Sequence, residues 1–362
     1  MKSQLSGLDI RFLVGEIQGW IGARIVKIFQ KEKLFVFEMY QSGKGGALLT
    51  CALPRWVYVA QEKDDFSLIP PLCQWLRKHI QGGKILAIKQ PGLERIIEIA
   101  VSTKEDRFVL VVEAFGTGNL FVLDNKRTIV ALMTNHEFKD RVLKKGESYI
   151  YPPIAPNPLE FDLEKVKSML AASNRPSISQ TLAQDFGLGG SWATEVSVRA
   201  GFDPKQKTAD PIKLLSALKS LNDLSLDPFL VFEDESPIDV TPIPFQNYKD
   251  APTRKLVSFS EGIAVLRKLN SIPRKGAVDK KIESVKVILD KQEESLLGLR
   301  GIMLENTRKG ELIYENYQVV QGVLDALKEA RKTLTWHDIK KKLKNPKIIS
   351  LDETKGELVI DL

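Results

Sequence analysis

The stretch KQPGLERIIEIAV (89–101) places an acid and a base, Glu94 and Arg95, between a Pro-Gly turn and a run of alternating apolar residues. The alternation predicts a β-strand, and a strand start needs no such pair. One interpretation is a solvated ion pair, and the other is a site on a rigid strand that reads a partner. Glu94 and Glu98 can also form a carboxylate pair for acid–base chemistry, although a solvent-facing acid is the simpler interpretation.

The sequence contains no motif that indicates catalysis. It has no GxSxG, HExxH, GxxxxGK[ST] or CxxC segment. The GTGN segment (116–119) is too short for a dinucleotide loop and predicts a hairpin turn. Two cysteines and three histidines argue against a disulfide framework and against a Cys/His zinc site. From the residues alone we expect no metal or cofactor, and catalysis is the less favoured interpretation.

Two further segments have the residue types that suit nucleic acid. WLRKHIQGGK (75–84) places Arg77 and Lys78 on a short helix, for which a solvated face is the alternative. FGLGGSWATEV (186–196) resembles a helix-hairpin-helix turn, whose backbone N–H groups at a helix N-terminus suit a phosphate oxygen. A plain helical hairpin is the alternative. The candidate phosphate contacts in this turn are Gly187, Gly189 and Gly190.

Asp9 and Arg11 lie near the start of a predicted amphipathic helix that Ser6 can cap. An aspartate in the first turn of a helix is favourable without any function, because it complements the helix dipole. A structural role and a role in a site therefore both stay open.

Composition favours a polyanionic partner. The formal net charge is +7 and the pI is about 9.1, and phosphate attraction is the largest sequence-independent contribution to nucleic-acid binding. Charge that serves solubility is the alternative. No apolar run approaches the ~20 residues that cross a bilayer, and the first residues have no apolar stretch of a secretion signal. We expect a cytoplasmic protein with no membrane association.

The pattern of elements predicts an α+β fold in several parts. Residues 1–158 alternate short strands with two helices, which indicates an α+β domain on antiparallel sheet. Residues 159–225 predict short capped helices, and residues 226–274 predict a strand-containing extension or linker. Residues 275–362 begin with apolar positions at helical spacing, which predicts a coiled-coil arm. The arm lacks a return helix, so we expect this chain to be part of a longer protein.

Several blocks together resemble one family in collinear order over nearly the whole chain. The blocks LSGLDIRFLVGEIQ, LRKHIQGGKI, PGLERIIEI, GTGNLFVLD and RVLKKGESYIYPP are similar to the NFACT-N domain. LGGSWATEVSVRAGFD is similar to the helix-hairpin-helix segment of that family, and NTRKGELIYENYQ to its coiled-coil and middle region. The family comprises ribosome-associated quality-control factors, long described as fibronectin-binding-protein-like. The sequence of the helix-hairpin-helix segment resembles archaeal members more than bacterial ones.

The resemblance implies a function and partners. Such factors bind the large ribosomal subunit that carries an obstructed peptidyl-tRNA, and recruit aminoacyl-tRNA for template-free C-terminal tailing, with alanine prominent. Alanyl-tRNA and the large subunit are the implied partners, the ribosome performs the peptide-bond chemistry, and a homodimer stays open. The C-terminal NFACT-R domain of the family is absent from this chain.

The resemblance also implies a tRNA site. The family's Asp-Arg pair falls on Glu94-Arg95, so a longer acid replaces the aspartate, and the family's N-terminal Asp falls on Asp9. With the basic residues named above, the expected tRNA-binding set is Asp9, Arg11, Arg77, Lys78, Glu94 and Arg95.

Two other functions are alternatives to a quality-control factor. A formamidopyrimidine-DNA glycosylase also joins a β-rich domain to a helical module, but its chemistry needs an N-terminal proline and a zinc finger. This chain begins Met1-Lys2-Ser3 and has two cysteines. A surface adhesin is the second rival, and no signal or anchor supports it.

Overall fold

The computed structural model describes residues 1–62, 66, 69–271, 277–342, 348–352, 355 and 357–361. The chain divides into two compact units, Met1–Ile272 and Pro273–Leu362. The boundary expected at 274/275 lies outside the described residues.

A nine-stranded antiparallel sheet forms the centre of the first unit, in the order β4-β3-β2-β1-β5-β6-β7-β8-β9. Its strands are β1 (Arg24–Lys31), β2 (Leu34–Gln41), β3 (Gly45–Ala52), β4 (Trp56–Ala60), β5 (Lys84–Lys89), β6 (Ile96–Ser102), β7 (Arg107–Glu113), β8 (Asn119–Leu123) and β9 (Ile129–Leu132). A small hairpin, β10 (His136–Glu137) with β11 (Val142–Leu143), follows it. The α+β class expected from the sequence agrees with this sheet.

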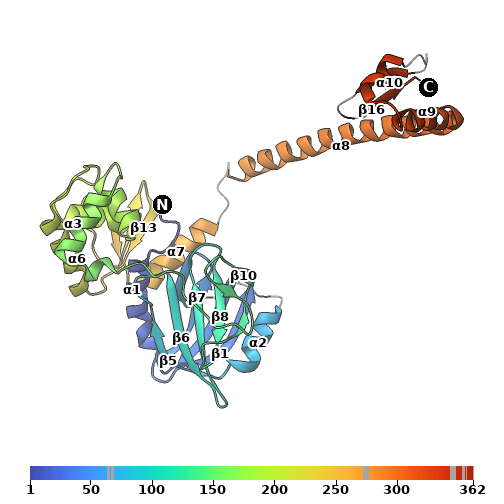
Figure 1. Ribbon diagram of the computed structural model, residues 1–362. Coiled ribbons are helices and arrows are strands. Elements are labelled where there is room, and N and C mark those ends of the chain that lie inside the picture. The colour runs from blue at the N-terminus through green and yellow to red at the C-terminus, as the bar shows by residue number, and fades with distance from the viewer. Residues whose placement is uncertain are drawn as a thin grey trace. The chain divides into compact units, whose positions relative to one another are not determined.

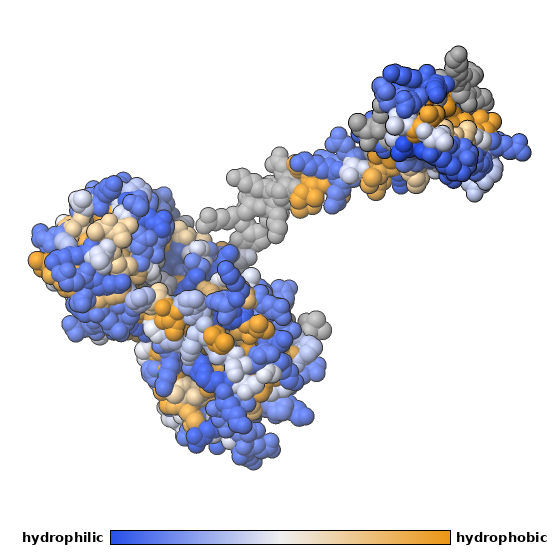
Figure 2. All heavy atoms as spheres, viewed as in Figure 1, coloured by the Kyte–Doolittle hydropathy of each residue, from blue (hydrophilic) through white to orange (hydrophobic). Residues whose placement is uncertain are grey.

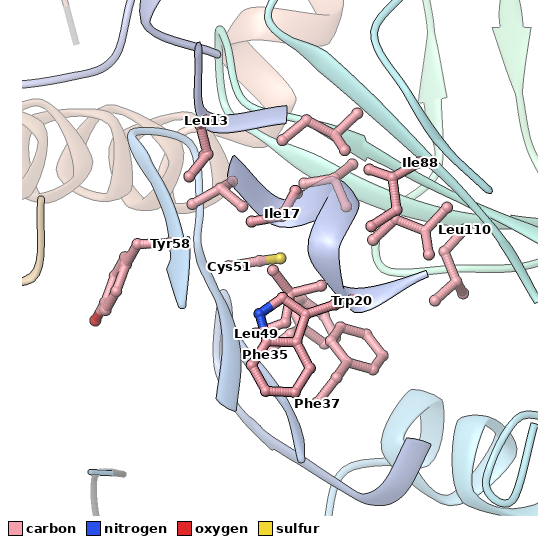
Figure 3. Close-up of a cluster of buried hydrophobic side chains, with 14 of the residues drawn as sticks. Leu13, Ile17, Trp20, Phe35, Phe37, Leu49, Cys51, Tyr58, Ile88 and Leu110 are labelled. Carbon is pink, nitrogen blue, oxygen red and sulfur yellow. The ribbon is translucent and has the colours of Figure 1, made fainter. Parts of the chain in front are cut away.

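The sheet consists of two halves that share one hydrophobic core. β1 pairs with β5 at a single position, where Arg24 faces Lys84. Side chains from both halves, such as Phe37 and Leu110, belong to the same buried cluster (Figure 3). The helices that complete this cluster are α1 (Gly7–Ile17), the 3-10 turn η1 (Gln18–Trp20), α2 (Pro71–His79) and α7 (Phe259–Ser271).

Helix α1 begins at Ser6 as the sequence predicts. The Ser6 hydroxyl accepts from the Asp9 backbone N–H, and the Asp9 carboxylate accepts from the Ser6 N–H, which is a reciprocal capping box. The helix has apolar residues on two sides. Leu13 and Ile17 enter the core of the sheet, whereas Leu8 and Phe12 enter a second core.

The second core belongs to a helical cluster beside the sheet (Figure 1). Its elements are η2 (Pro158–Glu160), α3 (Leu163–Ala172), α4 (Ile178–Gln180), the π-helical turn η3 (Thr181–Asp185), α5 (Gly190–Arg199), α6 (Pro211–Ser220) and η4 (Leu221–Asp223). The segment between η3 and α5 contains the predicted glycine turn. A helix-hairpin-helix motif stays a prediction.

The segment that we expected as a strand-containing extension or linker, 226–274, is folded within the first unit over its described residues, 226–271. It forms a three-stranded sheet in the order β13-β12-β14, from β12 (Phe229–Glu233), β13 (Ser236–Thr241) and β14 (Thr253–Lys255), with η5 (Gln246–Tyr248) before β14, and continues into α7. Its prolines resemble linker punctuation, but Pro237 lies on an edge strand, where a missing N–H is tolerated. Leu230 and Val240 enter the core of the first unit.

A buried ion pair fastens the segment after β9 to the sheet. Arg141 donates to the Glu113 carboxylate at 2.7 Å, and the Tyr149 hydroxyl donates to the same carboxylate at 2.8 Å. Burial and the adjacent Glu113 raise the pKa of Tyr149. The segment thereby returns across the sheet toward the helical cluster.

The second unit contains a 39-residue helix, α8 (Ala277–Glu315), then α9 (Tyr317–Arg331), α10 (Trp336–Lys342) and a hairpin of β15 (Ile348–Asp352) with β16 (Glu357–Ile360). Apolar side chains are exposed along α8, among them Leu296, Leu299 and Met303 (Figure 2). A coiled coil along this helix stays a prediction.

Replacing Arg141 tests the role of the buried pair. Arg141→Met leaves the Glu113 carboxylate buried without its cation, so the free energy of unfolding should fall by about 3–5 kcal/mol. Urea denaturation measures the change. Lys145→Met, at an exposed position nearby, should stay within about 0.5 kcal/mol. Equal effects of both variants would contradict the role of the pair.

Candidate nucleic-acid site

A cavity of about 360 Å³ opens where three segments of the first unit meet. The start of α1, the turn before β6 and the start of α5 each contribute to its lining. The lining includes Ser6, Gly7, Asp9, Leu93, Glu94, Arg95, Ala155, Pro156, Pro158, Phe186, Gly187, Gly189, Gly190, Ser191 and Trp192. Two predicted features far apart in sequence, the Glu94-Arg95 pair and the glycine turn, thus lie in one cavity.

The Asp9 carboxylate holds the segments around the cavity together. One oxygen accepts from the Lys2 ammonium at 3.0 Å and from the Trp192 indole N–H at 3.1 Å. The other accepts from the Ser6 backbone N–H and hydroxyl at 2.8 and 2.9 Å. Asp9 is 0 % exposed. Its carboxylate is thus buried and bound on both oxygens, and the tRNA contact that the sequence predicted for Asp9 stays a prediction.

Lys2 extends this network to β13. Its ammonium also lies 3.3 Å from Asp239, whose other carboxylate oxygen accepts from the Ser191 hydroxyl at 2.9 Å. Burial alone would lower the pKa of Lys2, but Asp239 and Asp9 outweigh it and the pKa is raised. A charged lysine thus joins the chain start, α1 and the strand that supports α5.

The turn before β6 lies directly on the backbone of α1. A Cβ on Gly7 would be 1.8 Å from the Leu93 carbonyl oxygen, so only glycine fits there. The Gln90 side chain donates to the carbonyls of Gly7 and Glu94, each at 2.8 Å. These contacts fix the position of the turn, and with it the side chains of Glu94 and Arg95.

The start of α5 presents backbone donors to the cavity. The N–H groups of Gly190, Ser191 and Trp192 donate to no residue that the structure describes, as expected for a first helical turn. Gly187 and Gly189 have φ angles of +74° and +79°, which glycine adopts at little cost. Gly190 has no such requirement. The three N–H groups and the positive end of the helix dipole together favour an anion.

Glu94 and Arg95 have different surroundings although they are neighbours. Glu94 accepts from the Ala155 backbone N–H at 3.0 Å, so its carboxylate holds the segment that follows the sheet. The half-buried Arg95 side chain forms no hydrogen bond or ion pair with any residue in the described ranges. Partial burial lowers the pKa of Arg95, which Glu94 opposes. Arg95 is therefore the cation of the cavity that is free to bind a ligand.

The remaining predicted residues lie elsewhere. Arg11 donates to Asn222 at 3.0 Å and does not line the cavity. Arg77, on α2, donates to the Ile28 carbonyl at 2.7 Å, and Lys78 follows it on the same helix. Arg11, Arg77 and Lys78 thus lie outside the lining of this cavity, and a role for them in tRNA binding stays a prediction.

The proposed carboxylate pair of Glu94 and Glu98 does not form. Glu98 lies inside β6 and accepts from Arg127 at 2.7 Å and from the Tyr151 hydroxyl. Burial and Glu98 raise the pKa of Tyr151 to about 12. Glu98 therefore binds the returning segment, as Glu94 does four residues earlier.

Sequence reasoning missed Trp192 and the proline segment. Trp192 stacks on Phe12 with ring centroids 5.6 Å apart, and so connects α5 to α1. Pro156 and Pro158 form part of the cavity wall, although their proline-rich stretch indicated only a boundary. A tryptophan two residues after the last glycine of the turn is the one signal that the sequence offered.

Over the described ranges, no group of three or more His, Cys, Asp or Glu side chains is arranged to hold a metal ion. Within the same ranges, none of the helices is both long and apolar enough to cross a membrane.

Comparison with known proteins identifies relatives. The family described as NFACT N-terminal and middle domains matches residues 6–357. The protein named Archaeal Rqc2 homolog aRqcH, from Methanocaldococcus jannaschii, is 29% identical over 100% of this chain and 58% of its own length. Ribosome quality control complex subunit 2, from Saccharomyces cerevisiae, is 30% identical over 38% of this chain and 14% of its own length. The chain thus spans little more than half of the archaeal relative.

A solved structure has the same fold. The N-terminal part of the fibronectin/fibrinogen-binding protein from Streptococcus suis aligns with 73% of this chain and 99% of its own, with a TM-score of 0.60 and 24% identity. At that identity the likeness concerns the fold alone.

Asp9→Asn distinguishes a structural Asp9 from a ligand-binding one. Removing one of the two acids beside the buried Lys2 should lower the free energy of unfolding by about 3 kcal/mol, measured by urea denaturation. Glu105→Gln, at an exposed acid, should change it by less than about 0.5 kcal/mol. Unchanged stability of Asp9→Asn together with weaker RNA binding would instead show that Asp9 contacts the RNA directly.

Proposed function

The chain belongs to the NFACT family of N-terminal and middle domains, and on this premise we propose that it is a ribosome-associated quality-control factor that binds tRNA in the cavity at the start of α5. The printed names of its relatives, Rqc2 homolog and Ribosome quality control complex subunit 2, support the cellular setting. The observation that carries the tRNA assignment is the cavity itself.

The cavity combines two kinds of donor for one anion. Arg95 offers a guanidinium that can bind a phosphate or a base edge in bidentate fashion. The first turn of α5 offers the N–H groups of Gly190, Ser191 and Trp192. A volume of about 360 Å³ lies in the range of small-ligand sites. Its occupant is therefore a single nucleotide of the tRNA, with its phosphate toward Arg95 and α5.

Glu94 has a supporting role in this proposal. Its carboxylate holds Ala155 at 3.0 Å and so keeps the segment with Pro156 against the cavity. The longer glutamate, in place of the aspartate of the family, reaches this backbone N–H.

The finer function follows from the family. The chain contacts the obstructed large subunit, which still carries peptidyl-tRNA, and brings aminoacyl-tRNA, alanyl-tRNA foremost, for template-free tailing of the stalled chain. The ribosome performs the peptide-bond chemistry, so the chain itself is not an enzyme, and it acts in the cytoplasm.

The second unit serves ribosome contact. Its long helix α8 exposes apolar side chains, Leu297 and Leu304 each 68 % exposed, alongside many charged ones. We assign this arm to the ribosome surface or to a return helix elsewhere in a longer chain.

Arg95→Ala tests the tRNA site. Loss of one charged hydrogen-bonding group removes about 1.5–3 kcal/mol, so tRNA affinity should fall by about tenfold or more in a filter-binding assay. The thermal midpoint should not change, because no residue that the structure describes depends on the Arg95 side chain for a hydrogen bond.

Matched variants complete this test. Arg95→Lys keeps the charge without the planar fork and should recover part of the affinity. Lys139→Ala, at an exposed cation away from the cavity lining, should bind within about twofold of the unmodified chain. If Arg95→Ala binds tRNA as tightly as Lys139→Ala does, the cavity is not the tRNA site.

Deleting residues 275–362 tests the second unit. Because the first unit has its own cores, the shortened chain should still fold and bind tRNA. Its co-sedimentation with large ribosomal subunits should decrease severalfold. Undiminished co-sedimentation would show that the arm makes no ribosome contact.

A further inference from the structure

A row of polar side chains crosses the sheet at the end opposite the cavity. Strand register places Tyr40 opposite Arg24, Arg24 opposite Lys84, Lys84 opposite Ser102 and Ser102 opposite Arg107. Residues directly opposite each other share a face of a sheet, so all five lie on one face. At about 4.8 Å per strand, the row is about 19 Å long.

The row carries positive charge without local compensation. Arg24, Lys84 and Arg107 are exposed, and none of them forms an ion pair with a residue in the described part of the chain. Arg24 donates to the Gly82 carbonyl at 3.1 Å, its one side-chain hydrogen bond to a described residue. Like charges placed directly opposite destabilise a sheet, so the Arg24–Lys84 pair has a cost that folding alone does not explain.

The acidic residues nearest to the row either lie opposite a basic residue, are bound by one, or lie in a turn outside the row. Glu38 pairs in register with Lys27, and Glu98 is bound by Arg127. Glu105 and Asp106 lie in the turn between β6 and β7. The row itself therefore contains three cations, two hydroxyl groups and no acid.

The backbone is irregular on both central strands beside the row. Register shifts occur between Ile25 and Lys27 on β1 and between Ile85 and Ala87 on β5. Bulges of this kind re-aim side chains and are frequent next to functional surfaces. Arg24 and Lys84 are the one register pair between β1 and β5, flanked by backbone hydrogen bonds, so the row crosses the joint between the two halves of the sheet at this pair.

We propose that this row binds the phosphate backbone of a paired RNA segment, as a second RNA surface separate from the Arg95 cavity. Paired RNA is recognised through its phosphates and 2′-hydroxyl groups rather than its bases. Arginine, lysine, serine and tyrosine side chains are the groups that contact phosphate and sugar. Protein interfaces are depleted of charge at their core, so an acidic protein fits the row less well. The length of β6, about 20 Å, separates Ser102 from Arg95.

A triple variant tests the row. Arg24→Gln/Lys84→Gln/Arg107→Gln in the full chain should bind a blunt RNA duplex of about 20 base pairs roughly tenfold more weakly near 0.1 M salt. The slope of log affinity against log salt should become shallower by about 3, because three phosphate contacts are lost. Filter binding across a salt series measures both quantities, and circular dichroism checks that the thermal midpoint is unchanged or higher.

A matched variant removes the same charge elsewhere. Lys126→Gln/Lys139→Gln/Lys145→Gln changes three exposed cations away from the row and should keep duplex affinity within about twofold. Equal affinities of the two triple variants would overturn the proposal, and so would a failure of the unmodified chain to bind the duplex.

Arg95→Ala separates this proposal from the tRNA site. It should bind the duplex as the unmodified chain does while losing tRNA affinity. Loss of duplex binding by Arg95→Ala would show that the duplex binds at the cavity, and would overturn the proposal for the row. If Arg95→Ala binds tRNA as tightly as the unmodified chain, the cavity is not the tRNA site, and the proposal for the row is unaffected.

Discussion

One buried carboxylate determines the arrangement of the candidate site. Asp9 is 0 % exposed and binds Lys2, Ser6 and Trp192 at the same time. Those residues belong to the start of the chain, the cap of α1 and the start of α5. A buried charge is tolerated only when its hydrogen bonds are complete, so each segment must take its place for the others to do so. The cavity is the space that this network leaves beside it.

Helix α1 shows what an amphipathic pattern can and cannot reveal. The spacing of Leu8, Phe12, Leu13 and Ile17 predicted the helix, and Ser6 predicted its start. Helical periodicity reports which positions are buried, but not what buries them. It could not show that Phe12 packs on Trp192, 180 positions away in the sequence, or that one helix serves two cores.

The site was predictable in its parts and not as a whole. Glu94-Arg95 and the glycine turn were each identified from local chemistry, and the structure brings them to one cavity. Arg11, Arg77 and Lys78 have the same residue types, and their helices turn them elsewhere. The sequence shows which residues are charged, but not which way their side chains point in the folded chain. The sequence could not show that Asp9 is buried either, because an aspartate in the first turn stabilises a helix whether it is buried or exposed.

Strand β6 connects the two proposed RNA surfaces and sets the distance between them. Arg95 directly precedes this strand and Ser102 ends it, and β6 is paired along its length with β5 and β7. A strand held on both sides cannot stretch or bend independently, so the distance between the cavity and the row is fixed by the backbone. An RNA assembly that occupies both surfaces must then present a single nucleotide and a paired segment about 20 Å apart. Rigid spacing of this kind selects a particular arrangement of two RNA elements, which neither surface could select alone.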